Sequence, residues 1–288
     1  MKYAELVKQG QRMLFKAGIP DSSCDAWILV EKICNISQTE YFMKMHEEVL
    51  KENEDKYFQA IEKRISHYPL QYILGEWQFM GLNFKVNENV LIPRQDTEIL
   101  VETAIRKIKE DFAKHKEEIS ILDMCTGSGC IGISLAKNFE NAVVTAVDVS
   151  EAALEVAKEN AEINQVSNIK FVKSDIFENI DEKFDIIISN PPYIKTSECE
   201  TLMPEVRDYE PRMALDGSED GLYFYKKIIK DARQYFKNDA YILFEIGYDQ
   251  REAVKSLLDG SGFNEIEALK DLSGNDRVVI GKRRSSLV

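Results

Sequence analysis

Apolar side chains recur at helical spacing from Met1 to about Ser66. Leu6 and Leu14 share one face of a first segment, and Ile61 belongs to the apolar face of a later one. Residues three or four positions apart fall on the same side of a helix. The pattern therefore predicts a small helical bundle whose apolar faces pack against one another to form a core.

Between Glu76 and Pro93 the spacing of apolar residues changes from helical to alternating. Apolar and polar residues take turns around Gly81 and Asn87, as they do in strands joined by tight turns. We therefore expect a β-hairpin that connects the helices to the rest of the chain. The polar residues from Arg94 onward then predict the start of another helix, with acids placed to suit its dipole.

From Ile119 onward, short apolar runs alternate with helical segments. The runs typical of strands are Ile119–Asp123, Ala142–Asp148, Lys170–Ser174, Asp185–Ser189, Tyr241–Ile246, Asn264–Leu269 and Arg277–Gly281. Helical periodicity lies between them at Gly129–Lys137, Glu151–Ile163, Gly221–Tyr235 and Gln250–Leu258. This alternation predicts an α/β fold, a Rossmann-like and mostly parallel sheet with helices on both faces. The long stretch from Tyr193 to Gly217 interrupts it and is typical of a lid or binding loop.

The predicted organisation has three parts. Residues 1–75 form a helical domain, residues 76–93 a β-hairpin linker, and residues 94–288 the α/β domain. A chain of 288 residues is long enough for one large and one small domain, each with its own core.

The composition is that of an ordinary soluble protein, with 44% hydrophobic and 30% charged residues. A net charge of −13 disfavours binding to bulk nucleic acid, which needs clusters of lysine and arginine, and suits a basic protein partner. Five cysteines without paired spacing predict reduced thiols in a cytoplasm. His46, His67 and His115 lack zinc-type spacing, so no metal is assigned. No apolar run approaches the length of a membrane span, and we expect a cytoplasmic monomer.

The most informative stretch runs from Ile186 to Tyr193. Three consecutive isoleucines predict a strand buried on both faces, and it must end at Asn190 because Pro191 and Pro192 cannot donate to a ladder. Ligands of α/β sheets bind at the carboxyl ends of such strands. The Asn190 side-chain oxygen and the Pro191 carbonyl could accept N–H groups from a planar amide or ring amino group, beside the Tyr193 ring. A proline-rich turn without further role is the alternative.

A glycine-rich segment joins the first predicted strand of the α/β domain to its first helix. Gly127, Gly129 and Gly132 match the spacing of the dinucleotide-binding fingerprint, and Asp148 lies at about the expected distance for a ribose contact. Glycines there allow a sharp turn and a close approach of ligand to backbone. NAD binding therefore stays open as an alternative.

Polar residues stand at the ends of four consecutive predicted strands. They are Asp123, Asp148, Asp175 and Asn190, and Ile176 beside Asp175 suits the face of an adenine. Each acid alone could be a turn or capping residue. An acid set without a phosphate-binding lysine nevertheless favours a nucleoside that carries a sulfonium over a pyrophosphate.

These motifs resemble the class I S-adenosylmethionine-dependent methyltransferases that modify planar nitrogen groups. The segments that carry this resemblance are Asp123–Gly129, Asp148, Ser174–Asp175 and Asn190–Tyr193. Further segments resemble the peptide chain release factor glutamine methyltransferase family, also called HemK or PrmC, over nearly the whole chain: Pro69–Gly75, Leu91–Glu98, Tyr209–Gly217 and Asp276–Val278.

The resemblance implies that S-adenosylmethionine is the cofactor and S-adenosylhomocysteine the product. The cofactor contacts that it implies are Asp123, Cys125, Thr126, Gly127, Ser128, Gly129, Asp148, Asp175, Ile176 and Asn190. The residues that it places at the reacting amide are Asn190, Pro191 and Tyr193. The substrate-binding set is Arg94, Glu98, Asn190, Pro191, Pro192 and Tyr193.

Two residues depart from the patterns of these families. Gln95 stands where the release factor enzymes usually have proline, and Cys125 stands where the general methyltransferase motif has its first glycine. A small side chain at Cys125 is expected to be tolerated if the backbone there does not need a positive φ.

The activity implied is methylation of the glutamine in the Gly-Gly-Gln motif of class I release factors. A glutamine methyltransferase for a large-subunit ribosomal protein and a nucleic-acid amino-methyltransferase are the nearest alternatives. An NAD-dependent oxidoreductase or a non-catalytic cofactor-binding module would leave the Asn190 corner without a role. The helical domain and hairpin are expected to help dock the protein substrate.

Overall fold

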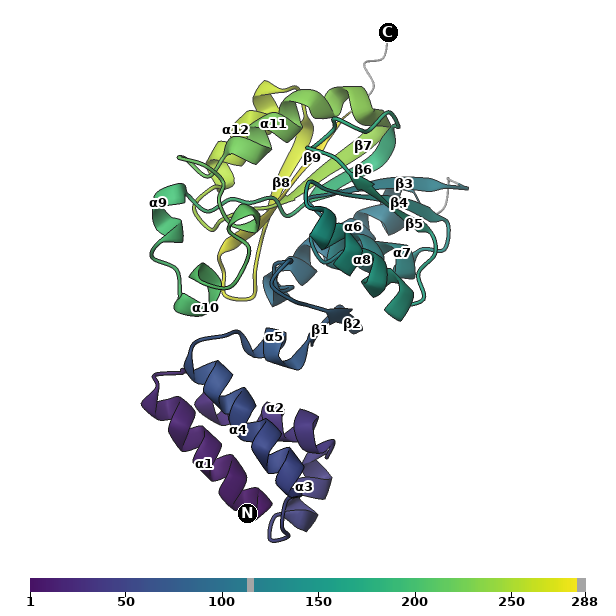
Figure 1. Ribbon diagram of the computed structural model, residues 1–288. Helices are drawn as coiled ribbons and strands as arrows, with labels where there is room; N and C mark the ends of the chain where they lie inside the picture. Colours follow the sequence, from purple (N-terminus) through teal and green to yellow (C-terminus); the bar gives the residue numbers. More distant parts are fainter. Residues whose placement is uncertain (113–116, 284–288) are drawn as a thin grey trace. The chain divides into compact units, whose positions relative to one another are not determined.

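The computed structural model describes residues 1–112 and 117–283, which divide into two compact units (Figure 1). The first unit comprises Met1–Glu76 together with Met203–Tyr209, and the second comprises the remainder. A short piece of the long stretch after Tyr193 therefore folds with the N-terminal helices. Nothing in the spacing of apolar residues had indicated that grouping.

The first unit is helical, as its apolar spacing predicted. Its elements are α1 (Tyr3–Lys16), α2 (Ser22–Cys34), α3 (Gln38–Lys44), α4 (Lys51–Ile65), α5 (Leu70–Leu74) and α10 (Pro204–Arg207). Leu6, Leu14 and Ile61 are fully buried in its core. The buried Arg64 ties α10 to this unit, because its guanidinium lies 2.7 Å from both Asp25 and Glu205.

The second unit begins at Trp77, within the predicted hairpin, which is formed by β1 (Glu76–Phe79) and β2 (Leu82–Lys85). The Asn160 side chain holds its second strand, since it accepts a hydrogen bond from the Lys85 N–H (2.6 Å) and donates one to the Lys85 carbonyl (3.0 Å). Beyond Lys85 the chain is irregular until α6 (Gln95–Asp111) begins.

The remainder of the second unit is an α/β fold. Its strands are β3 (Ile119–Met124), β4 (Ala142–Asp148), β5 (Ile169–Lys173), β6 (Phe184–Ser189), β7 (Phe236–Glu245), β8 (Asn264–Lys270) and β9 (Asp276–Lys282). Its other helices are α7 (Cys130–Asn138), α8 (Glu151–Ile163), α9 (Thr196–Cys199), α11 (Tyr223–Ala232) and α12 (Arg251–Gly260), with 3-10 turns η1 (Arg212–Ala214) and η2 (Arg233–Tyr235).

The sheet has the strand order β5-β4-β3-β6-β7-β9-β8. Strands β5, β4, β3, β6 and β7 run parallel, and β9 is antiparallel to both neighbours. The predicted mostly parallel sheet is confirmed. Pairing of Asp123 with Ile188 on one side and Ala146 on the other brings the carboxyl ends of neighbouring strands to one edge.

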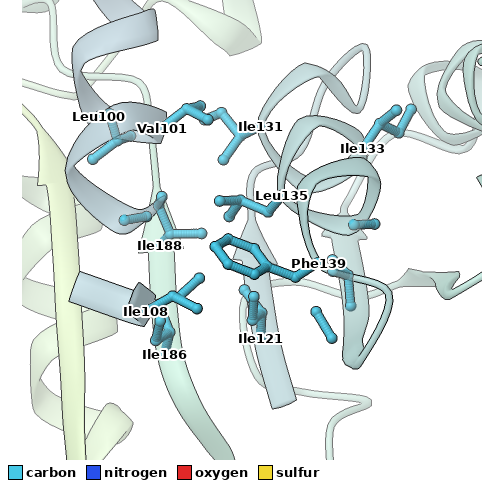
Figure 2. Close-up of a cluster of buried hydrophobic side chains, with 14 of the residues drawn as sticks. Leu100, Val101, Ile108, Ile121, Ile131, Ile133, Leu135, Phe139, Ile186 and Ile188 are labelled. Carbon is cyan, nitrogen blue, oxygen red and sulfur yellow. The ribbon is translucent and has the colours of Figure 1, made fainter. Parts of the chain in front are cut away.

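Two buried clusters cover the two faces of this sheet. Figure 2 shows part of one, in which Leu100 and Ile108 of α6 and Leu135 of α7 pack over β3 and β6. The other cluster packs α11 and α12 on the opposite face. Ile186 and Ile188 belong to the first cluster and Ile187 to the second, so the isoleucine run is buried on both faces as predicted.

The boundaries of two elements of the α/β fold differ from the expected ones by more than two residues. Strand β7 begins at Phe236, five residues before the predicted Tyr241, because Phe236 pairs with Phe184 across an irregularity in the register. Helix α11 begins at Tyr223 and gives way after Ala232 to a short 3-10 turn.

Candidate active site

A pocket opens at the carboxyl ends of β3, β4, β5 and β6, and it encloses about 930 Å³ of space when its open mouth is included. Ligands of α/β sheets bind at this edge. Of the residues expected from the sequence, the lining includes Arg94, Cys125, Thr126, Gly127, Ser128, Asp148, Asp175, Ile176, Asn190 and Pro192. Asp123, Gly129, Pro191, Tyr193 and Glu98 lie outside it. The strand ends therefore converge on one site, as their positions in sequence predicted.

The glycine-rich loop is held in shape by the carboxylate at the end of β4. Gly127 N–H and Ser150 N–H each donate a 2.9 Å hydrogen bond to the Asp148 carboxylate. Burial raises the pKa of Asp148, and these backbone donors act against that rise. The carboxylate thus faces the cavity while it anchors the loop.

The loop also needs left-handed backbone at several positions. Gly127 has φ 53° and Gly129 has φ 82°, which glycine adopts without steric cost. Cys125 has φ 61°, so the condition under which its side chain should be tolerated is not met. The usual glycine of the motif has a physical reason here, and Cys125 carries local backbone strain.

Asp123 lies beneath the loop and is completely buried. Its Oδ2 accepts hydrogen bonds from the Thr126 hydroxyl (2.6 Å) and the Gly132 N–H (2.9 Å), and its Oδ1 has no hydrogen-bonding partner. Burial raises the pKa of Asp123 to about 7, and the nearby charge of Asp148 adds to the effect. Asp123 supports the loop from below, and its direct contact with a ligand stays a prediction.

Asp175 and Ile176 follow β5 at the rim of the cavity. The Asp175 carboxylate forms an ion pair with Lys227 at 3.1 Å. Ile176 is buried and has φ 55°, an uncommon conformation for a β-branched residue. Strain of this kind persists where surrounding structure imposes it, which often happens at binding sites.

The corner after β6 presents Asn190 and Pro192 to the cavity. The Asn190 side-chain amide donates to the Thr97 hydroxyl oxygen (3.3 Å), and the Tyr193 hydroxyl donates to Glu245 Oε1 (3.2 Å). Burial raises the pKa of Tyr193. Its ring packs against the core cluster of α11 and α12, so contact between this ring and a substrate stays a prediction.

Arg94 and Glu98 belong to the same motif and face different surroundings. Arg94 lines the cavity and forms an ion pair with Glu210, whose other oxygen accepts the Ile92 N–H at 3.2 Å. Glu98 accepts the Met80 N–H at 2.6 Å, which ties α6 to the hairpin turn. A role for Glu98 in binding substrate stays a prediction.

Several contributors to the site were missed in the sequence. Thr97 lay inside a quoted motif without a role, and Met213 and Phe224 reach the lining from distant segments. Glu245, behind the corner, carries the signal used for Asp123 and Asp148: it is an acid at the end of a buried strand. The predicted strand ended one residue later, at Ile246, so the same rule did not select Glu245.

Within residues 1–112 and 117–283, no group of three or more histidine, cysteine or acidic residues could hold a metal ion. His115, one of the histidines considered, lies outside the described residues. Over the same described ranges, no helix has the length and apolar character needed to cross a bilayer.

Comparisons with known proteins identify the family of the chain. A family model described as the PrmC N-terminal domain matches residues 5–75, and one described as the methyltransferase small domain matches residues 97–205. A release factor glutamine methyltransferase from Fusobacterium nucleatum is 41% identical over 97% of this chain and 78% of its own length. The chain belongs to the release factor glutamine methyltransferase family.

Other relatives extend the family assignment. A release factor glutamine methyltransferase from Clostridium botulinum is 40% identical over 97% of this chain and 98% of its own length. A solved methyltransferase structure from Pyrococcus furiosus superposes with a TM-score of 0.51 at 18% identity, covering 82% of this chain and all of that one, which supports the fold. A family of methyltransferases needs a methyl donor.

Proposed function

We propose that this protein transfers a methyl group from S-adenosylmethionine to the side-chain amide nitrogen of the glutamine in the Gly-Gly-Gln motif of class I release factors. The carrying observation is identity of about 40% with enzymes of that name over nearly the entire chain, helical domain included. On this proposal the protein acts as a cytoplasmic monomer on a protein substrate and does not bind bulk nucleic acid.

The lining of the cavity fits S-adenosylmethionine better than NAD. Its acids are Asp148 and Asp175, and Arg94, already paired with Glu210, is the basic residue among the described lining positions. A pyrophosphate would meet these carboxylates without a free lysine, whereas a cationic nucleoside is favoured by them. Asp148 can accept hydrogen bonds from the hydroxyl groups of a ribose, because the loop leaves some lone pairs of its carboxylate available.

The bound cofactor would supply a methyl group already activated by the positive charge on sulfur. An amide nitrogen is a poor nucleophile, because its lone pair is delocalised into the carbonyl. The protein's part is to hold that nitrogen, which gives a proximity effect of several kcal/mol. Acceptors at Asn190 Oδ1 and the Pro191 carbonyl would take its two N–H groups and stabilise positive charge as it develops there. As the N–CH₃ bond forms and the S–CH₃ bond breaks, S-adenosylhomocysteine would be left, and the nitrogen would release one proton to water.

A methylation assay tests the proposal. Purified release factor, labelled S-adenosylmethionine and this protein are incubated, and the methyl group is mapped by mass spectrometry. We expect label on the Gly-Gly-Gln glutamine and none on a release factor with that glutamine changed to alanine. The large-subunit ribosomal protein serves as competitor, and faster methylation of that protein would overturn the assignment. Thermal shifts with S-adenosylmethionine, S-adenosylhomocysteine and NAD separate methyl transfer from oxidoreductase chemistry.

A further inference from the structure

A buried polar chain lies directly behind Asn190. The Asn190 amide nitrogen donates to Thr97 Oγ1 at 3.3 Å, and Thr97 is only 2% exposed in the first turn of α6. A hydroxyl that accepts a hydrogen bond still has one proton to donate. Because the site is buried, that proton needs an acceptor within the protein.

The neighbouring acceptor is Glu245, which ends β7 and is 2% exposed. Its Oε1 accepts the Tyr193 hydroxyl at 3.2 Å, while its Oε2 has no hydrogen-bonding partner. Burial raises the pKa of Glu245, and the adjacent Thr97 hydroxyl, the charge of Arg277 and the Tyr193 hydroxyl each act to lower it. The Thr97 hydroxyl thus acts on the Glu245 carboxyl, whose Oε2 is a buried acceptor that receives no hydrogen bond in the structure.

We infer that Thr97 and Glu245 are positioning residues that set which way round the Asn190 amide lies. A carboxylate can only accept, so Thr97 donates to Glu245 and must in turn accept from Asn190. One N–H of the Asn190 amide is then held by Thr97, and Oδ1 is left to face the cavity. This inference rests on the proposed function, in which Oδ1 accepts an N–H of the substrate glutamine.

The opposite orientation of the amide would fail on two counts. Asn190 Oδ1 would take the Thr97 proton, and the buried Glu245 Oε2 could then receive no hydrogen bond from Thr97. Its NH₂ group would then face the NH₂ group of the substrate, donor against donor. The hydrogen-bond polarity of Glu245 therefore selects the productive orientation.

Two motifs that the site had left without a role surround this chain. The Arg277 guanidinium lies 3.1 Å from both Asp96 and Asp271. The charge of Arg277 lowers the pKa of Glu245, and the charge of Asp96 raises it. The ionised form is the one that cannot donate to Thr97. Residues 94–98 and 276–278 thus both influence the orientation of the Asn190 side-chain amide.

Four variants test this inference, with methyl transfer to the release factor and affinity for S-adenosylmethionine as separate readouts. Thr97→Val removes the hydroxyl while keeping the shape, and should lower kcat by about tenfold or more, the equivalent of one lost orienting hydrogen bond. The Kd for S-adenosylmethionine should stay within about twofold, below the energy of one hydrogen bond. Thr97→Ser should restore kcat, and Thr103→Val, at another buried threonine of α6, should leave it unchanged.

Glu245→Gln is the most specific variant, because it keeps the shape of the side chain and replaces a carboxylate oxygen, which accepts, with an NH₂ group, which donates. Its NH₂ group can donate to Thr97, whose proton then turns to Asn190 Oδ1 and favours the flipped amide. We expect a fall in kcat as large as that of Thr97→Val, with unchanged cofactor affinity and retained folding. Wild-type kcat in either variant would overturn the inference, and so would a Thr97→Ser variant as slow as Thr97→Val.

A readout without substrate keeps this result apart from that of the proposed function. The Asn190 side-chain amide signal in ¹⁵N NMR, identified by its loss in Asn190→Asp, should exchange slowly in the wild type and rapidly in Thr97→Val. Equal exchange in both would refute the Thr97 contact. Failure of the wild type to methylate the release factor, with the exchange difference intact, would refute the proposed function while leaving the orientation of the amide established.

Discussion

The two sides of the cavity are built in different ways. On the cofactor side, a strand, a glycine loop and a helix that are continuous in sequence form the site, and Asp148 holds the loop through backbone N–H groups. On the acceptor side, Asn190, Thr97 and Glu245 come from distant parts of the chain and meet through side chains. Backbone conformation therefore shapes one side, and side-chain hydrogen-bond polarity shapes the other.

The difference should appear most strongly in Asn190→Ala. We expect kcat to fall about 10²- to 10³-fold, as when a group that stabilises developing charge is removed, while the Kd for S-adenosylmethionine changes much less. Single-turnover methylation and calorimetry measure the two quantities. Methyl transfer at the normal rate by Asn190→Ala would show that Asn190 has no part in the mechanism. The two sides of the cavity would then not differ in the way described.

Asp123 makes the cofactor side sensitive to pH. Its pKa is 3.8 in the unfolded chain and about 7 in the folded protein, so the folded state binds this proton more tightly. Protonated Asp123 therefore contributes to the free energy of unfolding, by an amount of the order of a few kcal/mol. This contribution is fully present below about pH 4 and is lost as the pH rises through about 7. Urea unfolding of wild type and Asp123→Asn at several pH values measures it. A difference between the two that does not vary with pH would contradict this titration.

Asp148→Ala should affect cofactor affinity rather than turnover of the bound complex. We expect binding of S-adenosylmethionine to weaken by about 1–3 kcal/mol, because hydrogen bonds in a buried site are lost and the glycine loop loses its anchor. Calorimetry gives the dissociation constant, and Asp148→Asn serves as a variant that retains one acceptor. An unchanged constant in Asp148→Ala would show that the ribose contact is misplaced.

Two glycines of the loop form a matched pair for the role of the backbone. Both have positive φ, so Gly127→Ala should cost about 1 kcal/mol of stability through strain alone. An alanine at Gly129 would also place its Cβ 2.8 Å from Ile133 Cδ1 and 3.1 Å from the Ala157 Cβ, which should add about 1 kcal/mol or more. Chemical denaturation compares the free energies of unfolding of the two variants. Equal losses of stability would show that the neighbouring side chains of α7 and α8 move aside without cost.

Much of the cofactor side was predictable because its information is local. Strand, turn and helix signals follow one another between Ile119 and Ile163, and each strand end carries its own acid. The strain at Cys125 could not be read in this way, since the backbone angle depends on how the loop closes over Asp123. The same holds for the membership of residues 203–209 in the helical unit, which depends on the buried partners of Arg64.

The sequence by itself determined the α/β fold, the order of strand-end residues and the family. Periodicity, proline chemistry and motif spacing act over a few residues, so one chain suffices to read them. Only the tertiary structure decided that Thr97 and Glu245 stand behind Asn190, 93 and 55 positions away along the chain. Hydrogen-bond partners buried between distant strands are selected by packing, and packing leaves no periodic trace in a sequence.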